Sequence, residues 1–418
     1  MDIRYFYNIA KDRMKYGCDL NDFHDLKTGK FLKSANQKMR LNLVMSSVNA
    51  KTTYGGGATI YTFFQQLKDR LNCDVRVITL DDSAQESNIG GVFADFRIAA
   101  PSEETEYAST LVGYPENNGE RPCLMIREKD VFITTYWTTM YVAGYFRAFQ
   151  DRAYGQHQNL IYFIQDYEPG FYEWGSEYLL AESTYRIPDT VAVFNSEELK
   201  NYFDKYDYQF ADRFWFTPKL NRPMKEYLLQ AMDSQEKPER KPQVIIYGRP
   251  RIWRNCFSLV VASLKQALEY EEKLRGWQFL SLGASHKDID LGYGAKLVCK
   301  GKLTLEEYAR TLLETKIGIS LMCSPHPSYP PLEMAAFGVN TITNSFLCKD
   351  LSTFSKNIIS VDNATPENFA SALVTGMNRK TDLMDRDDPY LQDEDQFSEI
   401  IDDLIRKLKK ENAGETGC

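Results

Sequence analysis

Residues 244–254 read VIIYGRPRIWR, and this stretch decides the fold of the second half of the chain. Its first four residues are apolar and mostly β-branched, which is typical of a buried strand, and Gly248 ends the strand. Arg249 therefore stands at the carboxyl end of a strand, and Arg254 lies one turn into the next element. That element has the apolar spacing of a helix, at Trp253, Phe257, Val260, Val261, Leu264 and Leu268.

The two arginines occupy the edge at which an open α/β sheet binds its ligand. Two guanidinium groups beside a helix N-terminus form a suitable site for a diphosphate. Solvated surface arginines at a helix start are the ordinary alternative. The position of Arg249 directly after a glycine-terminated strand favours the binding interpretation.

Length and composition limit the class of protein. A chain of 418 residues exceeds what one hydrophobic core usually supports, so we expect two domains. The formal net charge of −8 argues against a dedicated nucleic-acid binder. No apolar run approaches the roughly 20 residues of a membrane span, and the first residues do not form a signal peptide. The eight cysteines lack C-x-x-C spacing, which predicts buried, reduced thiols and a cytoplasmic location.

Short apolar strands alternate with helices twice along the chain, which predicts an α/β fold with two doubly wound, Rossmann-like domains facing a central cleft. Eleven strands are expected, at 41–48, 74–80, 131–136, 159–165, 190–194, 244–247, 277–282, 296–299, 316–322, 339–343 and 357–361. The polar stretch SQEKPERKPQ favours a linker between the two series. The expected parts are an extension (1–40), an N-terminal domain (41–220), a linker (221–243), a C-terminal domain (244–390), and a helix with a tail (391–418).

The two ends of the chain differ in character. Residues 1–40 carry nine Lys/Arg against five Asp/Glu, with aromatic residues between them. Such a segment suits peripheral contact with anionic lipid at the inner face of a membrane, and equally an extension packed on the first domain. Residues 395–410 have the apolar spacing of one helical face, with basic residues at the end.

Two further motifs bear on ligands. Gly55–Gly57 separate a predicted strand from a predicted helix, where backbone can approach a ligand closely, but they match neither a dinucleotide fingerprint nor a Walker motif. Asp288 and Asp290 have the spacing of a metal-binding pair. The same spacing recurs elsewhere in this acidic chain and lacks a strand-end context, so we predict no metal site.

Residues 303–344 form a second informative stretch. A helix leads into a strand, a proline-rich turn follows, and Glu333 is expected to start the next helix. A carboxylate in a first helical turn is favourable by itself because of the helix dipole. Alternatively, the Glu333 carboxylate accepts hydrogen bonds from the two vicinal hydroxyls of a ribose.

Together these segments resemble the family-4 retaining glycosyltransferases, which have the two-domain GT-B fold. The resemblance covers about residues 40–410 and rests on a set of features in a fixed order, namely Gly248-Arg249, Arg254, Gly301-Lys302-Leu303, Ser324 to Leu332, Glu333 and Gly338. More narrowly, IQDYEPGFYEWGSEY (164–178) and SPHPSYPPLEMAAFG (324–338) are similar to rhamnosyltransferases of bacterial S-layer glycan synthesis. The resemblance implies transfer of L-rhamnose from dTDP-β-L-rhamnose, with retention, to a lipid-linked or oligosaccharide acceptor.

The resemblance also implies the site residues. The catalytic group is Arg249, Lys302 and Asp166. The cations Arg249 and Lys302, together with Arg254, stabilise the leaving diphosphate without a metal or other cofactor. Asp166, or alternatively Glu168, orients the acceptor hydroxyl. Binding of the nucleotide sugar is assigned to the C-terminal domain and to one glycine of the first, through Gly57, Gly248, Arg249, Arg254, Gly283, Lys302, Leu303, Tyr329, Pro330 and Glu333. Binding of the acceptor is assigned to the N-terminal domain, through Gln165, Asp166, Tyr167, Tyr172 and Trp174.

Two positions depart from the family pattern. Many members carry a Glu where this chain has Pro325, with His326 beside it, so the donor hexose must be held differently. Gln165 stands where relatives often have a His that binds the primary hydroxyl of the sugar, a group that L-rhamnose lacks. Two alternatives stay open: a sugar-nucleotide epimerase with the same fold, and a catalytically silent glycan-binding homologue.

Overall fold

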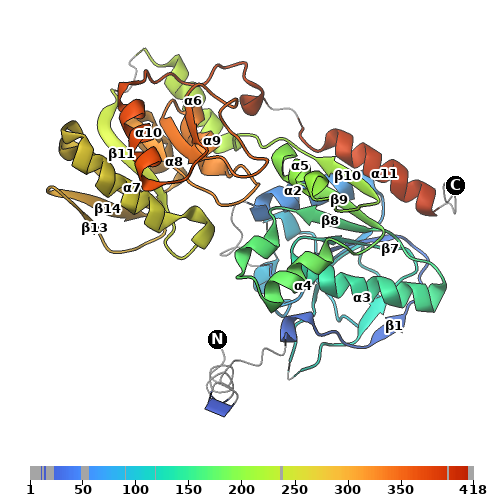
Figure 1. Ribbon diagram of the computed structural model, residues 1–418. Coiled ribbons are helices and arrows are strands. Elements are labelled where there is room, and N and C mark those ends of the chain that lie inside the picture. Colours follow the sequence, from blue (N-terminus) through green and yellow to red (C-terminus); the bar gives the residue numbers. More distant parts are fainter. Residues whose placement is uncertain are drawn as a thin grey trace. The chain divides into compact units, whose positions relative to one another are not determined.

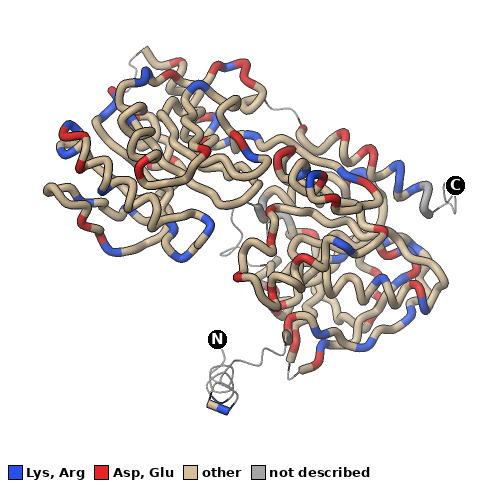
Figure 2. The backbone as a smooth tube through the Cα atoms, in the orientation of Figure 1, with Lys and Arg blue, Asp and Glu red and all other residues tan. Residues whose placement is uncertain are grey.

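The computed structural model describes residues 11, 14–15, 23–48, 56–89, 91–117, 119–235, 239–392 and 395–412. The chain divides into two compact units, one of residues up to Ile161 together with those from Leu408 onward, the other of Tyr162–Lys407. Charges of both signs are interspersed along each of them (Figure 2). Within the described residues, no helix is long and apolar enough to cross a membrane. About half of the expected extension 1–40 lies outside the described residues.

The first large sheet has eight strands in the order β10-β9-β8-β7-β2-β3-β5-β4 (Figure 1). Its central strand β2 pairs in parallel with β3 and β7, and all three are fully buried. Their apolar residues lie in the core, and the buried arginines Arg40 and Arg76 pair with Asp130 of β7. The strands are β2 Arg40–Met45, β3 Asp74–Thr79, β4 Arg97–Ile98, β5 Ser109–Gly113, β7 Asp130–Thr134, β8 Leu160–Ile164, β9 Thr190–Phe194 and β10 Asp212–Trp215. A separate parallel pair joins β1 Phe31–Lys33 to β6 Leu124–Ile126, and the helices are α2 Gly56–Arg70, α3 Trp137–Tyr154, α4 Ser176–Thr184 and α5 Glu197–Lys205.

The second sheet has seven strands in the order β13-β14-β12-β11-β15-β16-β17, all parallel except the β13–β14 hairpin. The strands are β11 Lys241–Gly248, β12 Gln278–Gly283, β13 Ile289–Gly292, β14 Ala295–Gly301, β15 Thr315–Ile319, β16 Asn340–Asn344 and β17 Ile358–Val361. The helices are α6 Arg222–Asp233, α7 Phe257–Tyr270, α8 Leu305–Glu314, α9 Tyr329–Ala336 and α10 Pro366–Asn378. The last helix, α11 Ser398–Asn412, contacts the first sheet instead, where its Lys407 bonds with Asp212 of β10. Helices α7 and α10 supply one apolar cluster, and α6, α8 and α9 supply another, so the second sheet is covered on both faces.

All eleven predicted strands are present, each within a few residues of its expected bounds. The predicted C-terminal helix is confirmed as α11, whose apolar residues are buried at Ile400, Ile401, Leu404 and Leu408. The fold class is therefore the expected one, an α/β protein with two doubly wound sheets.

Three expectations were wrong. Within the stretch 221–243, expected to be a linker, residues Arg222–Asp233 form α6, because Met224 and Leu228 are spaced to share one buried face. Trp253, expected on the buried face of a helix, is 90% exposed in the short 3-10 helix η5 Trp253–Asn255. The described cysteines are free thiols, as expected, but they are half-buried or exposed rather than buried.

Candidate functional site

In the second sheet, successive strands are added on opposite sides of the central strand β11. The chain runs from β11 to β12 and β14 on one side, and through β15, β16 and β17 on the other. The gap between the carboxyl ends of β11 and β15 is thus the switch point at which doubly wound sheets bind ligands. The segments that leave these two ends, 249–256 and 320–328, form the candidate site.

Gly248 and Gly283 bring backbone close together at this edge. They are paired across β11 and β12, and the Ala284 amide donates to the Gly248 carbonyl at 2.8 Å. A Cβ atom on Gly248 would stand 1.9 Å from the Ser281 hydroxyl oxygen, so a larger residue would force the Ser281 side chain to move. Gly283 has a φ of +124°, a conformation that side chains disfavour. The chain therefore leaves β11 tightly, and Arg249 follows at once.

Arg249 is half-buried beside Tyr247, with its guanidinium carbon 6.0 Å from the centre of the tyrosine ring. One guanidinium nitrogen is 3.5 Å from the Tyr247 hydroxyl oxygen. Among the residues that the structure describes, no carboxylate pairs with Arg249, in contrast to Arg254. The charge is thus available at the end of β11, where the sequence predicted it.

Arg254 lies in η5 and contacts residues that follow β8 in the same unit. Its Nε is 3.5 Å from a carboxylate oxygen of Asp166, and its guanidinium stacks over the Phe171 ring at 4.2 Å. Asp166 is buried and also accepts hydrogen bonds from the Ser324 hydroxyl and from the Tyr167 amide, the latter at 2.8 Å. Three predicted or neighbouring site residues, Asp166, Arg254 and Ser324, thus come together.

The segment after β15 is held in place by two buried side chains. The side-chain oxygen of Asn344, at the end of β16, accepts from the Met322 amide at 2.8 Å, and its NH₂ donates to the Met322 carbonyl at 3.1 Å. The Lys349 ammonium donates to the same carbonyl at 2.6 Å. Lys349 is fully buried, and burial lowers its pKa to about 8. No sequence pattern indicated Lys349, which lies 27 residues after Met322.

His326 lies in the middle of this segment and is 6% exposed. Its Nδ1 accepts a hydrogen bond from the Ser328 amide at 3.0 Å, so the neutral ring carries its proton on Nε2. Burial lowers the pKa of His326 to about 4, with a smaller opposing effect of Asp166. Sequence reasoning noted His326 only as the neighbour of Pro325.

Glu333 lies in the second turn of α9, not at the start of a helix as predicted, because Tyr329 and two prolines form the first turn. The residue keeps some solvent contact, but protein surrounds its carboxyl group. Burial raises the pKa of Glu333 to about 7, and the neighbouring Tyr308 hydroxyl opposes this shift by stabilising the charged form. Because burial destabilises the charged form of this carboxyl group, a ligand that donates hydrogen bonds to it would stabilise the carboxylate.

The other residues predicted to bind a nucleotide sugar have varied positions. Lys302 is exposed directly after β14, and Leu303 is half-buried against the α6–α8 cluster. Tyr329 and Pro330 open α9, and the Tyr329 hydroxyl donates to the Asn195 side-chain oxygen at 3.0 Å. Gly57 lies in the first turn of α2, in the other compact unit.

The residues predicted to bind an acceptor follow β8. Gln165 is half-buried and lies at the carboxyl end of β8, next to Asp166. Tyr167 packs in a group of aromatic rings, and its hydroxyl is hydrogen-bonded to those of Tyr178 and Tyr208 at 3.2 and 3.1 Å. Tyr172 is half-buried. Trp174 is 92% exposed and stacks on Tyr178 with ring centres 5.6 Å apart, so its outer face is open to solvent.

The aspartate pair of the second sheet has local partners. Asp288 accepts from the Cys299 amide and Asp290 from the Gly292 amide, each at 2.9 Å, and both bonds brace the β13–β14 hairpin. Over the residues that the structure describes, no group of three or more His, Cys, Asp or Glu side chains is arranged to hold a metal ion.

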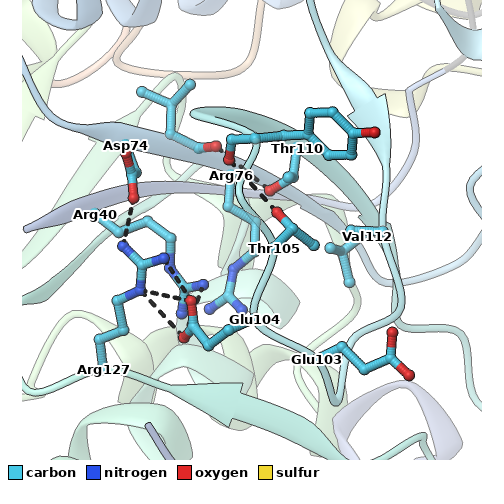
Figure 3. A pocket seen from close by; sticks show the side chains of 12 residues that line it. Arg40, Asp74, Arg76, Glu103, Glu104, Thr105, Thr110, Val112 and Arg127 are labelled. Atoms are coloured by element: carbon cyan, nitrogen blue, oxygen red, sulfur yellow. Dashed lines mark hydrogen bonds and ion pairs between the residues drawn. The ribbon is translucent and has the colours of Figure 1, made fainter. Parts of the chain in front are cut away.

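A separate polar pocket in the first unit lies at the amino ends of the strands (Figure 3). Three buried arginines pair there with three carboxylates, with close pairs such as Arg40–Asp130 at 2.7 Å and Arg127–Asp74 at 2.7 Å. The six residues are Arg40, Arg76, Arg127, Asp74, Glu104 and Asp130. Burial and the neighbouring Arg40 lower the pKa of Arg76 to about 9. Because ligands bind at the opposite edge of such sheets, we interpret this cluster, named here the arginine network, as structural.

Comparisons with known proteins agree with this architecture. The family model described as the WsaF N-terminal domain matches residues 40–197, and that of the WsaF C-terminal domain matches residues 242–374. A curated relative, the O-antigen biosynthesis protein RfbC of Myxococcus xanthus, is 28% identical over 292 residues, which are 70% of this chain and 21% of that protein. The chain thus spans about a fifth of the length of this relative.

Solved structures show the same fold at low sequence identity. Sucrose-phosphate synthase of Thermosynechococcus elongatus has a TM-score of 0.55 and 11% identity, covering 90% of this chain and all of the other. HepE of Anabaena, solved in complex with UDP and glucose, has a TM-score of 0.51 and 10% identity, covering 90% and 98%. The two domain models together account for more than two thirds of the residues. The chain belongs to the WsaF family, and it shares the two-domain GT-B fold of these solved structures.

Proposed function

We propose that this protein transfers L-rhamnose from dTDP-β-L-rhamnose, with retention of configuration, to a rhamnose-containing surface polysaccharide such as an S-layer glycan. The observation that carries the proposal is that Arg249 and the segment 320–328 leave the ends of β11 and β15, the two strands that flank the switch point, and that Glu333 lies in α9, the helix that follows. These groups suit the phosphates, sugar and ribose of one nucleotide sugar. The curated relative acts in O-antigen biosynthesis by its name, which supports a polysaccharide acceptor.

Each part of the donor has a proposed partner. The leaving diphosphate gains negative charge as the bond to the anomeric carbon breaks, and Arg249 with Lys302 stabilises that charge. Glu333 accepts hydrogen bonds from the ribose hydroxyls. Arg254 contributes less than expected from sequence, because part of its charge is already offset by Asp166 at 3.5 Å.

The acceptor hydroxyl is proposed to attack from the face that the diphosphate leaves. Its proton passes to the departing phosphate oxygen, so that no separate base is required. Asp166 orients the acceptor rather than removing its proton, because its carboxylate already accepts from the Ser324 hydroxyl and the Tyr167 amide. The open face of Trp174 suits stacking on a sugar of the acceptor.

The test is a donor-consumption assay with dTDP-β-L-rhamnose, with and without an oligorhamnoside acceptor. Transfer predicts release of dTDP that depends on the acceptor, together with a product one rhamnose longer. Conversion of the donor sugar without acceptor would instead identify an epimerase. Binding of the oligorhamnoside without donor consumption would identify a silent glycan-binding protein.

A further inference from the structure

His326 carries a buried hydrogen-bond donor without a partner. Among the described residues, its Nε2 is enclosed and makes no hydrogen bond, although the side chain is only 6% exposed. A buried donor left unsatisfied is destabilising, so this one calls for a partner that the chain itself does not supply.

The direction of this donor is fixed by the segment around it. The Ser328 amide donates to Nδ1 at 3.0 Å, and the Ser324 hydroxyl oxygen accepts from the His326 amide at 3.0 Å. Ser328 has a φ of +68°, in the left-handed region that side chains rarely adopt. Strain of this kind persists where a particular side-chain orientation is maintained. These contacts thus fix the orientation of the imidazole ring, and of its Nε2–H group, before any ligand binds.

The surrounding groups indicate what this donor binds. His326 lies within the electrostatic influence of one carboxylate, Asp166, and of the cations Arg254 and Lys349. A phosphate oxygen accepts hydrogen bonds but cannot donate one to Asp166, and both cations already have partners, Arg254 in Asp166 and Lys349 in the Met322 carbonyl. A sugar hydroxyl both accepts and donates, so it can pair with a neutral Nε2–H and with a carboxylate together. The combination of a neutral donor and a carboxylate therefore favours a sugar hydroxyl.

We propose that the Nε2–H of His326 donates a hydrogen bond to a hydroxyl group of the sugar that is transferred, and so helps to select that sugar. The inference rests on the proposed function, because it assumes a nucleotide-sugar donor at this edge of the sheet. It assigns His326 to the sugar and not to the diphosphate.

The matched variants are His326→Asn and His326→Gln. Asparagine keeps an acceptor where Nδ1 meets the Ser328 amide but removes the donor at Nε2. Glutamine keeps a donor near the Nε2 position. His157→Asn, at a histidine of the first unit that contacts Asp151, is the control. Calorimetry with dTDP-β-L-rhamnose and with dTDP measures how much affinity the sugar adds.

We expect His326→Asn to weaken binding of dTDP-β-L-rhamnose about tenfold while dTDP binding stays unchanged, and His326→Gln to recover part of the loss. An equal loss for both ligands, or none for either, would overturn the inference. A wild-type protein that binds neither ligand would instead overturn the proposed function, and the inference with it.

A second measurement does not depend on a folded variant. In wild-type protein labelled with ¹⁵N-histidine, the His326 Nε2–H resonance should shift when dTDP-β-L-rhamnose binds and shift much less with dTDP. Identical shifts with the two ligands would contradict contact with the sugar. The chain has four histidines, so the signal can be assigned.

Discussion

At the scale of single residues, Arg249 is expected to matter most to the chemistry. It is half-buried at the end of β11, and its proposed role is to stabilise the negative charge that develops on the leaving diphosphate. Arg249→Ala should lower the turnover rate about a hundredfold and leave the unfolding free energy nearly unchanged. Rhamnosyl transfer at saturating donor, with urea denaturation in parallel, checks this. Arg251→Ala, at an exposed arginine two residues later, is the control and should keep the wild-type rate.

Transfer should also proceed after divalent metals are removed. The proposed neutralisation of the diphosphate comes from Arg249 and Lys302, and Asp288 and Asp290 are engaged with the amides of a hairpin. We therefore expect the same rate in EDTA as in Mg²⁺ or Mn²⁺. A rate abolished by EDTA and restored by metal would show that cationic side chains alone do not suffice.

Glu333 predicts a dependence of stability on pH. Its pKa is about 7 in the folded protein, above its ordinary value of 4.5, so the folded state favours the protonated form. The stability that this proton provides is complete below about pH 4.5 and is lost as the pH rises through 7. The Glu333→Gln variant avoids this loss, which is on the order of 3 kcal/mol.

The unfolding free energy of Glu333→Gln should therefore gain on that of the wild type between pH 5 and pH 8, as measured by urea denaturation. Glu306→Gln, at an exposed glutamate of α8, serves as the control and should run parallel to the wild type. Parallel curves for Glu333→Gln would contradict the burial effect. The same variant should bind dTDP more weakly, because an amide is a poorer acceptor than a carboxylate.

At the scale of elements, α6 is the clearest case for experiment. Its Met224 side chain is fully buried with Leu228 in the cluster below the second sheet. Met224→Ala should reduce the unfolding free energy by about 2–5 kcal/mol, whereas Gln230→Ala on the exposed side should change it little. Equal, small effects of the two changes would mean that the segment is a linker after all.

The same helix shows where sequence reasoning fails. The parallel strands were predictable because each is a short apolar run buried on both faces, a pattern that few other elements share. Segment 221–243 mixes prolines and charges with an apolar stripe, and composition concealed the stripe's helical spacing. Trp253 was misassigned for the opposite reason, since an apolar residue at helical spacing need not be buried.

At the scale of the whole molecule, the second sheet should form a separable nucleotide-binding unit. Residues 244–376 contain the strands, apart from the first three residues of β11, and every predicted donor contact except Gly57. They lack α6 and the buried residues Tyr390 and Leu391, which belong to the same apolar cluster. A fragment of residues 219–392 should therefore fold and bind dTDP like the full chain, and the shorter one should be markedly less stable. Thermal unfolding and calorimetry compare the two. Loss of dTDP binding in a folded 219–392 fragment would place donor contacts elsewhere.

The candidate site was only partly predictable for a related reason. Arg249 follows a strand and Glu333 a recognisable loop, so local sequence indicates both. Lys349 and Ser324 acquire their positions from partners far along the chain, at Met322 and Asp166 respectively. A polar residue in a loop gives no sign of such a partner, because tertiary packing alone brings the two together.

The arginine network restricts how this sequence can evolve. Removing one member of a buried ion pair leaves its partner charged in a dry environment, which costs about 3–5 kcal/mol, whereas replacing the whole group with well-packed apolar residues can be neutral. The single carboxylate of Asp130 accepts hydrogen bonds from both Arg40 and Arg76. Single substitutions there are therefore expected to be deleterious individually and tolerated only in combination, so the six positions should change together across descendants or not at all.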